Sequence, residues 1–495
     1  MKLFRASGIL LHPTSLPGPF GIGDFGKECF TFLEFLLLTE QKIWQINPLT
    51  PTGFGDSPYQ CFSSFAGNPL LINLAKLEEW GWLEAEDLTG GSYSEEKVNF
   101  EAVQKFKKKA FQKAYAYFLE KASALDQKKF LNFCHRQESW LNDFTLFMAL
   151  KDQFQGKAWN TWDNDLVLRN KETLERWRLK LDREIGYYQF LQFVFFQQWQ
   201  EIRAYCQTNG IKIIGDLPLY PAYDSADVWT HPDLFTLDKQ RQMTFVAGVP
   251  PDYFSKKGQF WGNPLYRWEV MKEEHYRWWK QRIRYSLEMV DLLRLDHFRG
   301  FESYWEIPAG SEDARSGRWV PGPADHFFTA MEEEFGRLPF IAEDLGIIPP
   351  EVDRLREMFG LPGMKILQFA FDGKSATHPY LPHQYDKNCV VYTGTHDNEP
   401  MLSWWEQVDV GIKEQVLRYL GKQSVQIHRE MIRLALASAA NFAIFPLQDI
   451  LGLGKESRMN TPSLAEGNWT WRMKPEQITK EMMEMLGNWT RTFGR

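Results

Sequence analysis

Four separate segments of the chain share one pattern and decide the fold: IKIIGDLPLY (Ile211–Tyr220), DLLRLDHFRG (Asp291–Gly300), PFIAEDLG (Pro339–Gly346) and VVYTGTHDN (Val390–Asn398). Each contains a short apolar run that is followed by a charged or polar cluster and a turn. Apolar runs of this length, with polar groups at their C-terminal ends, are typical of parallel strands covered on both faces. The four segments therefore predict parallel strands whose C-terminal ends carry functional side chains.

Four further apolar runs raise the predicted strands to eight. The full set is Gly8–Leu11, Ile43–Ile46, Lys212–Gly215, Asp291–Leu295, Phe340–Ala342, Lys365–Phe369, Val390–Tyr392 and Ala443–Phe445. Several of them follow a helical pattern, such as Tyr188–Thr208 or Glu351–Phe359, although residues 372–387 show none. Strands that alternate with helices in this way predict an α/β fold, a (β/α)8 TIM barrel, with its chemistry at the C-terminal rim.

The uneven spacing of the predicted strands indicates large insertions on the rim. Residues 73–183 are mostly helical by pattern, residues 225–267 are rich in Pro, Gly and aromatics, and residues 301–325 form a shorter insertion. We expect a helical subdomain, a loop-rich substrate cleft and a short excursion, respectively. The segment from Trp469 onward is expected to be helical, which leaves no C-terminal β-sandwich. The prediction is one catalytic domain over residues 1–495.

Composition excludes several classes of function. The formal net charge is −7 with a pI near 5.9, so no basic excess exists to bind nucleic acid. Five cysteines without a CxxC pair favour a cytoplasmic protein without a disulfide frame or zinc site. The sequence contains no run of 18 apolar residues, so no membrane-spanning helix is expected. The GxGxxG match at residues 21–26 lacks the strand that a nucleotide site requires directly before it, so we expect no cofactor.

Two acidic side chains at predicted strand ends are candidates for catalysis. Asp296 stands two residues after Arg294, so both point to the same side, and the guanidinium is expected to keep the carboxylate ionised, as a nucleophile requires. A structural Arg–Asp pair is the alternative. Glu343 follows an apolar run, and its pKa is expected to be raised near Asp296, which suits a general acid. Asp344 is its rival, but neighbouring strand residues face opposite ways.

Further polar groups follow the third and seventh predicted strands. His396 and Asp397 could bind sugar hydroxyls and hold a ring in a distorted form, while Asp216 could orient substrate or anchor Arg294. Several carboxylates that converge on one barrel mouth favour glycosidic-bond chemistry. The 15% aromatic content, with 20 Trp, agrees with this, because flat rings cover the apolar faces of sugars.

With these segments identified, the chain resembles the amylomaltases (4-α-glucanotransferases, or disproportionating enzymes), a family of the α-amylase clan. The resemblance covers nearly the whole chain. Besides the four opening segments, it rests on GILLHPTSLPGPFGIGD (Gly8–Asp24), SPYQ (Ser57–Gln60), VAGVPPDYFSKKGQFWGNPLY (Val246–Tyr266) and RMNTPS (Arg458–Ser463).

The resemblance implies a role for each candidate residue. Asp296 corresponds to the nucleophile, Glu343 to the acid/base and Asp397 to the transition-state stabiliser. Residues implied to contact or line the sugar site are Tyr59, which stacks on the sugar, Arg294 and His396 beside the donor sugar, and Asp216, Trp261 and Asn460 along the cleft. The loop around residues 248–255 is implied to cover part of the acceptor side.

The expected activity is a retaining double displacement. A segment of an α-1,4-glucan would pass from a maltooligosaccharide, starch or glycogen-type donor to the 4-hydroxyl of a glucose or maltooligosaccharide acceptor, with no metal. An α-1,4-glucan hydrolase is an alternative that uses the same carboxylates. A non-catalytic glycan-binding barrel is a third possibility, but it predicts a disrupted catalytic set, whereas all three carboxylates are present.

Overall fold

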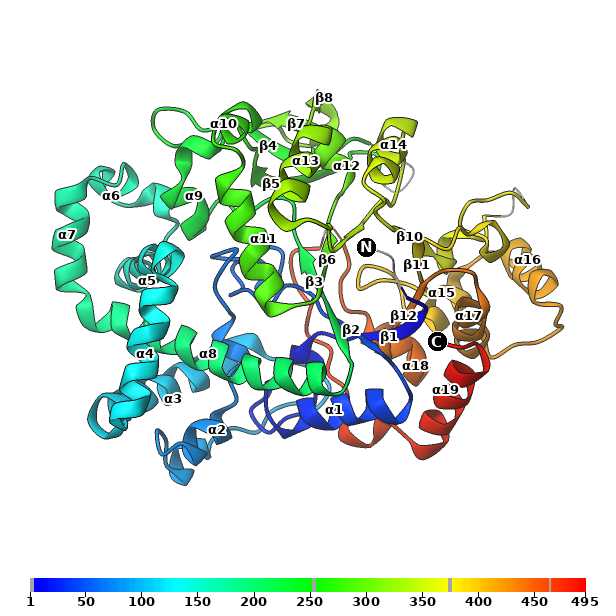
Figure 1. Ribbon diagram of the computed structural model, residues 1–495, viewed down its shortest axis with the longest axis horizontal. Helices are drawn as coiled ribbons and strands as arrows, with labels where there is room; N and C mark the ends of the chain where they lie inside the picture. The colour runs from blue at the N-terminus through cyan, green and yellow to red at the C-terminus, as the bar shows by residue number, and fades with distance from the viewer. Residues whose placement is uncertain (1–3, 252–254, 373–375, 463) are drawn as a thin grey trace.

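The centre of the molecule is a closed barrel of eight parallel strands, in the computed structural model that describes residues 4–251, 255–372, 376–462 and 464–495 (Figure 1). The strands run around the barrel in the order β1-β12-β11-β10-β9-β6-β3-β2. Their bounds are β1 Ala6–Leu10, β2 Ile43–Gln45, β3 Lys212–Leu217, β6 Leu292–Leu295, β9 Phe340–Ala342, β10 Gly363–Ile366, β11 Cys389–Tyr392 and β12 Phe442–Pro446. The TIM-barrel prediction is confirmed, and each predicted strand overlaps one of the eight.

Apolar side chains fill the inside of the barrel. Every strand contributes to one separate buried cluster, in which Ile43, Ile214, Ile341, Tyr392 and Ile444 are all fully buried. A filled barrel has no pore, so any ligand must bind at the rim. The seam of the barrel joins the two ends of the chain, because β1 pairs with β12 in parallel from Ala6↔Phe442 to Leu10↔Pro446.

Helices surround the barrel in the alternation that the sequence predicts. They are α1 Lys27–Leu38, α8 Asp182–Thr208, α11 Arg277–Met289, α13 Ala324–Phe335, α14 Pro350–Met358, α15 Met401–Gln407, α16 Val410–Leu420, α17 Ile427–Ala437 and α19 Lys480–Thr492 (Figure 1). Between β10 and β11 the described residues contain only short 3-10 turns, such as Pro382–Gln384. The missing helical pattern of residues 372–387 therefore matches the structure over that described part.

The chain between β2 and β3 contains a group of helices at one side of the barrel, coloured light blue to cyan in Figure 1. These helices are α2 Leu74–Glu79, α3 Phe100–Lys121, α4 Ala124–Arg136, α5 Glu138–Gln153, α6 Asn164–Val167 and α7 Lys171–Lys180. A buried Lys107 on α3 ties the group to the barrel, since its ammonium donates to the carbonyls of Leu70 (2.7 Å) and Ile72 (2.8 Å).

A four-stranded antiparallel sheet, in the order β5-β4-β7-β8, is the part of the fold that the sequence did not predict. Its strands are β4 Phe245–Val249, β5 Gln259–Pro264, β7 Ser303–Pro308 and β8 Arg318–Pro321. Two come from the segment expected to be loop-rich and two from the short insertion. β4 pairs with β7, although the barrel strand β6 lies between them in the sequence. Gly248 also interrupts the alternation of apolar and polar residues along β4. Neither segment therefore shows a strand pattern on its own.

The prediction of a helix from Trp469 onward was wrong over its first half. After β12 and the short α18 (Leu447–Leu451), the described chain has no α-helix until Lys480. Trp469 has a positive φ of 63°, and Trp471 forms a β-bridge with Lys97. The aromatic and basic residues of this stretch mimic a helical pattern, but they pack along the rim as extended chain.

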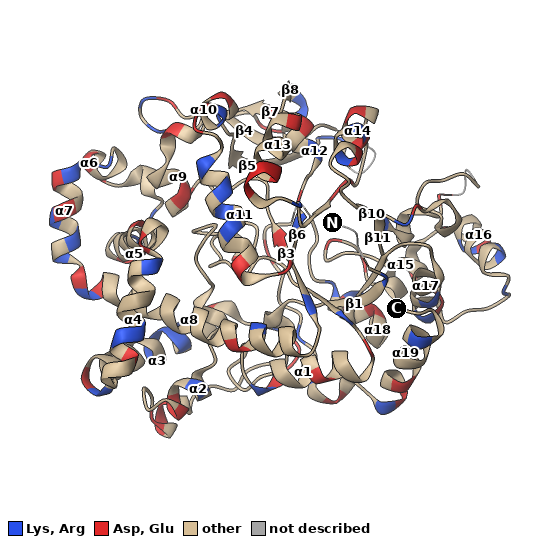
Figure 2. Ribbon diagram, viewed as in Figure 1, with Lys and Arg blue, Asp and Glu red and all other residues tan. Residues whose placement is uncertain are grey.

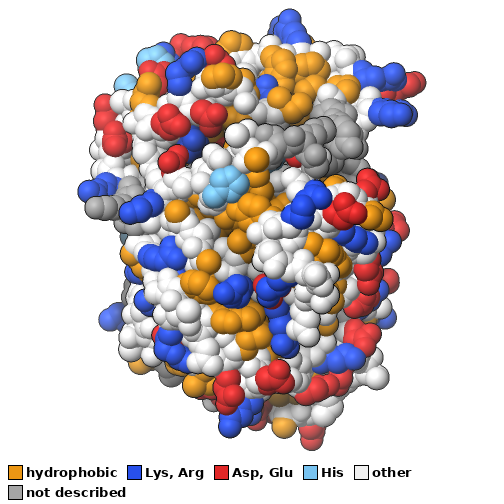
Figure 3. All heavy atoms as spheres, turned by 90° about the vertical axis from the view of Figure 1, so that its right-hand side faces the viewer, with side chains coloured by type: hydrophobic (Ala, Val, Ile, Leu, Met, Phe, Trp, Pro, Cys, Tyr) orange, Lys and Arg blue, Asp and Glu red, His pale blue; other side chains and the backbone are white. Residues whose placement is uncertain are grey.

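Charged side chains lie mainly on the outer helices, and both signs are mixed on α7 and α19 (Figure 2). Figure 3 shows the face that forms the right-hand side of Figure 1, where charges of both signs lie among hydrophobic side chains. This mixture agrees with the small net charge of the sequence. Within the described ranges, none of the helices is both long and apolar enough to cross a membrane.

Candidate active site

The ends of three neighbouring strands bring the first group of predicted residues together. In the register of the sheet, Asp216 on β3 lies beside Arg294 on β6, and Leu295 on β6 lies beside Ala342 on β9. Asp296 and Glu343 each follow the last paired residue, so they stand at the same level of the rim. The amide N–H of Glu343 donates to the carbonyl of Leu295 at 3.1 Å, which continues the ladder to this point.

Arg294 connects the carboxylates of this group. Its Nε and Nη2 donate to Asp216 Oδ2 at 2.9 and 2.7 Å, and its Nη2 also donates to Asp296 Oδ1 at 2.9 Å. The Tyr59 hydroxyl donates to the same oxygen of Asp216 at 2.6 Å. The Asp216 side chain is 0% exposed, whereas that of Asp296 is 30% exposed. Of the two interpretations of Asp216, the geometry therefore favours an anchor for Arg294 over a contact with sugar.

Backbone amides hold Glu343 from two sides. Its Oε2 accepts from the N–H of His297 at 2.7 Å, and its Oε1 accepts from the N–H of Leu345 at 3.1 Å. His297 adopts a positive φ of 52°, a conformation uncommon for a residue with a side chain. It places the chain just after Asp296 against Glu343, so the Glu343 carboxylate helps to position the end of β6.

The neighbouring Asp344 points away from the mouth. Its Oδ1 accepts from the N–H of Met364 at 2.7 Å, and Arg356 Nε lies 3.2 Å from its Oδ2. A Cβ atom on Gly363 would lie 2.2 Å from this carboxylate, so the close approach requires glycine. The alternation along β9 therefore separates a cleft-facing Glu343 from a structural Asp344.

Both cleft carboxyl groups have raised pKa values, for the same main reason. Burial, and next the negative charge of Asp296, raise the pKa of Glu343 to about 8. Burial raises the pKa of Asp296 to about 7 against the lowering effect of Arg294. The expectation that Arg294 lowers the pKa of Asp296 and so keeps it ionised was wrong for the net shift, because desolvation outweighs the guanidinium. Of the two carboxyl groups, Asp296 is the one whose ionised form the guanidinium contact stabilises.

His396 and Asp397 occupy the loop after β11, across the mouth. Asn460 Nδ2 donates to Asp397 Oδ1 at 2.6 Å, and His396 Nε2 lies 3.4 Å from Asp397 Oδ2. The His396 ring stacks on Tyr59, with 5.3 Å between centroids and 21° between planes. Burial lowers the pKa of His396, so the imidazole is neutral near pH 7. The Asp397 side chain is 45% exposed and is free to meet a ligand.

Two tryptophans lie at the edges of this group. Trp261 on β5 was predicted, and its ring meets the His297 ring edge-on at 4.8 Å between centroids. Trp469 was missed, although its ring lies 5.7 Å from Tyr59 and 5.6 Å from His396. No sequence signal marks Trp469, because the stretch around it has a helix-like pattern and reaches the rim only through tertiary packing.

All nine predicted site residues surround the barrel mouth or support a group that does. Part of the predicted acceptor-side loop, residues 252–254, lies outside the described residues, as does Ser463 of the RMNTPS segment. Among the residues that the structure describes, no group of three or more His, Cys, Asp or Glu side chains could hold a metal ion. The arrangement offers two neighbouring carboxyl groups with raised pKa values beside aromatic rings.

Comparisons with known proteins agree with this geometry. A family model described as 4-alpha-glucanotransferase matches residues 11–479. The 4-alpha-glucanotransferases of Synechocystis sp. and Thermus thermophilus are 47% and 46% identical to the chain, over 99% and 97% of it and over 98% and 97% of their own lengths. The structure of an amylomaltase from Streptococcus agalactiae in complex with acarbose superposes with a TM-score of 0.96 at 40% identity, over 99% of both chains. The chain therefore belongs to the 4-alpha-glucanotransferase family.

Proposed function

We propose that this protein transfers segments of α-1,4-glucans by a retaining double displacement. Donors would be maltooligosaccharides and starch or glycogen-type glucans, and acceptors would be glucose or maltooligosaccharides. The observation that carries the proposal is the pair Asp296 and Glu343, at one level of adjacent strand ends, where only Asp296 receives a bond from Arg294. One carboxyl group is thereby prepared to ionise and the other to keep its proton.

In the first step Glu343 gives its proton to the glycosidic oxygen. The carboxylate of Asp296 attacks the anomeric carbon, the bond to the leaving chain breaks, and a covalent glycosyl-enzyme forms. In the second step Glu343, now ionised, removes the proton of an acceptor 4-hydroxyl. That oxygen attacks the anomeric carbon and releases Asp296. Both displacements invert the anomeric carbon, so the product keeps the α configuration.

Asp397 would stabilise the oxocarbenium-like transition state from the other side of the mouth. Its Oδ1 is held by Asn460, while its Oδ2 is left for sugar hydroxyls beside His396. A neutral His396 can donate one hydrogen bond to a hydroxyl group without repelling positive charge that develops on the sugar ring. Tyr59 would cover an apolar face of the donor sugar, and the buried Trp469 would support the rings of Tyr59 and His396 from behind.

Transfer requires that an acceptor sugar outcompetes water for the glycosyl-enzyme. We assign this to the acceptor side of the mouth, where the loop that begins at Gly248 and the segment of residues 458–462 would order the acceptor sugar. If replacement of that loop by a short glycine linker left the ratio of transfer to hydrolysis unchanged, this assignment would be wrong. A cytoplasmic location is supported by the five free cysteines, because exported proteins usually oxidise theirs.

Incubation with pure maltotriose tests the activity directly. Disproportionation yields glucose together with maltopentaose and longer chains, and hydrolysis cannot lengthen a chain. Glucose and maltose alone would identify an α-glucan hydrolase, the second candidate, which uses the same carboxylates. If the protein were correctly folded but turned over no maltotriose, a non-catalytic glycan-binding barrel would be favoured.

A further inference from the structure

One buried carboxylate outside the sugar site, Asp449, contacts both ends of the loop that carries His396 and Asp397. Its Oδ2 accepts from the hydroxyl of Thr393 at 2.5 Å, directly after β11. Its Oδ1 accepts from the N–H of Met401 at 2.6 Å, the first residue of α15. We call residues 393–401 the catalytic loop. Asp449 comes from α18 and is 1% exposed, so it cannot contact a sugar.

The buried charge of Asp449 calls for an explanation. The two donors to Asp449, the Thr393 hydroxyl and the Met401 amide, are both neutral, and burial raises its pKa to about 6. An unpaired buried carboxylate is costly, whereas an apolar side chain would pack at this place without that cost. A carboxylate, however, offers two acceptor oxygens at a fixed separation. It can therefore bind two donors from opposite ends of one loop at the same time.

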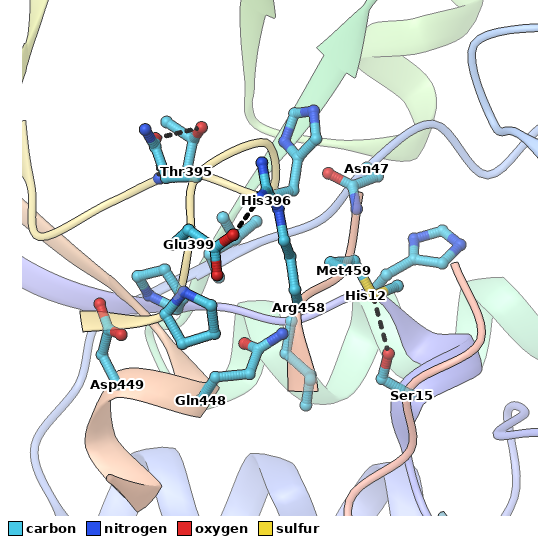
Figure 4. A pocket seen from close by; sticks show the side chains of 15 residues that line it. His12, Ser15, Asn47, Thr395, His396, Glu399, Gln448, Asp449, Arg458 and Met459 are labelled. Atoms are coloured by element: carbon cyan, nitrogen blue, oxygen red, sulfur yellow. Dashed lines mark hydrogen bonds and ion pairs between the residues drawn. The ribbon is translucent and has the colours of Figure 1, made fainter. Parts of the chain in front are cut away.

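Neighbouring segments support the middle of the catalytic loop by hydrogen bonds: the N–H of Asn460 donates to the carbonyl of His396 at 3.0 Å, and Gln368 Nε2 donates to the carbonyl of Glu399 at 2.7 Å. A cavity of about 20 Å³ lies under the loop, lined in part by Thr395, His396, Glu399 and Asp449 (Figure 4). The buried His12 Nδ1 atom, on the far side of this cavity, has no hydrogen-bond partner. Close packing, which fixes most loop conformations in a core, is therefore incomplete here, and hydrogen bonds must fix the loop instead.

Arg458 also supports the catalytic loop, and in Figure 4 it lies on the other side of Glu399 from Asp449. Its Nη2 donates to the carbonyl of Asp397 at 2.8 Å, and its Nη1 pairs with the Glu399 carboxylate. Arg458 thus holds the centre of the catalytic loop together with Asn460 and Gln368, while Asp449 binds its two ends. With the ends and the centre fixed, the side chain of Asp397 keeps its direction toward the mouth.

We propose that Asp449 is a positioning residue for the transfer reaction and acts through Asp397. It binds the Thr393 hydroxyl and the Met401 amide, and it thereby fixes the loop that presents Asp397 to the transition state. This inference rests on the proposed function of Asp397. A misplacement of about 1 Å at a catalytic group can cost on the order of 100-fold in rate, so loss of the clamp should be visible in turnover.

The test compares three variants in the maltotriose assay, at a temperature well below each melting point. Asp449→Ala should lower kcat at least ~10-fold and leave KM within about 3-fold of wild type, since no sugar contact is lost. Asp449→Asn keeps the shape, accepts from Met401 and donates to the Thr393 oxygen, so it should keep kcat within about 3-fold. Thr393→Val removes one donor and should fall between them. It also carries the test if the alanine variant does not fold.

Asp291→Ala is the matched control for stability. Asp291 is also a largely buried carboxylate, which accepts from Arg203 (2.6 Å) and the N–H of Ile213 (2.9 Å), but it lies at the opposite end of the barrel. The Asp291→Ala variant should have a lower melting temperature than the wild type and an unchanged kcat. If Asp449→Ala behaved like Asp291→Ala, with an earlier melt and an unchanged kcat, Asp449 would be only structural and the proposal would fall.

A double-mutant cycle with Asp397→Asn decides whether Asp449 acts through Asp397. In the Asp397→Asn background, Asp449→Ala should cost less than about 3-fold further in single-turnover rate. If the two losses multiplied, Asp449 would act by another route and the proposal would be overturned. The rate ratios of the double-mutant cycle can be measured on the transfer reaction or on the hydrolysis reaction. A wild type that only hydrolyses would therefore refute the proposed function without touching this test.

Discussion

The two sides of the barrel mouth position their carboxylates in different ways. On one side, Asp296 and Glu343 directly follow β6 and β9, and the main-chain ladder between Leu295 and Glu343 holds them in register. On the other side, Asp397 lies five residues beyond β11 and depends on side chains from distant segments, Asn460 and Arg458. A strand end inherits its position from the barrel, whereas a loop must be positioned by contacts of its own.

The largest effect is expected on the strand side. Asp296→Ala removes the nucleophile and should lower the transfer rate by at least ~10⁴-fold, because the covalent route is lost. The fold should survive, since the Asp296 side chain faces the cleft. Measurement of maltotriose turnover and of the melting temperature checks both statements. A fully active variant would refute the assignment of the nucleophile.

A smaller loss is expected on the loop side. Asn460→Ala removes the bond to Asp397 Oδ1 and should lower kcat by about 10- to 100-fold, as expected when a group that orients a catalytic residue is removed. Arg418→Ala, whose exposed side chain pairs only loosely with Glu414, is the control and should change nothing. Equal losses from Asn460→Ala and Asp296→Ala would erase the contrast between the two sides.

The pH profile probes the strand side through its two carboxyl groups. Activity requires Asp296 ionised and Glu343 protonated. As pH falls below about 7, Asp296 takes up its proton, and as pH rises above about 8, Glu343 loses its own. The ratio kcat/KM should therefore peak between these values and fall toward about tenfold per pH unit on either side. A flat profile from pH 5 to pH 10 would contradict the requirement for one ionised and one protonated carboxyl group.

The smallest effect on activity is expected one residue beyond the acid/base. Asp344→Asn weakens the contact with Arg356 and should lower the free energy of unfolding by about 1–3 kcal/mol, while turnover at 25 °C stays near wild type. Glu343→Gln should do the reverse, with lost turnover and a nearly unchanged melting temperature. Denaturant unfolding and the maltotriose assay on both variants measure this difference between neighbours.

The same contrast explains what the sequence could predict. The four opening segments show both the barrel strands and the residues at their ends, because burial on two faces leaves a short apolar run. Asp296 and Glu343 were identified in this way. Trp469, Arg458 as a support and Asp449 were not, because each reaches the site through tertiary contacts that no local pattern records. The sheet of β4, β5, β7 and β8 was missed for a related reason, since its pairing joins two separate segments.

The pKa of Asp296 shows a further limit. The sequence places Arg294 beside it and correctly predicts a lowering effect, but it does not say how deeply both groups are buried. Desolvation scales with the whole surroundings of a group, while an ion pair depends on one neighbour. The structure is needed to weigh desolvation against an ion pair, whereas the sequence is enough to identify the residues of the pair.

The pairing of β1 with β12 means that two neighbouring barrel strands are synthesised far apart in time. β1 ends at Leu10 and its partner β12 begins only at Phe442, so β1 leaves the ribosome long before β12 does. At the usual pace of translation, roughly 20 to 90 s separate the two strands. During that time one edge of β1 remains unpaired and could bind another nascent chain. We expect this protein to depend on chaperones during its synthesis more than its folded stability would suggest.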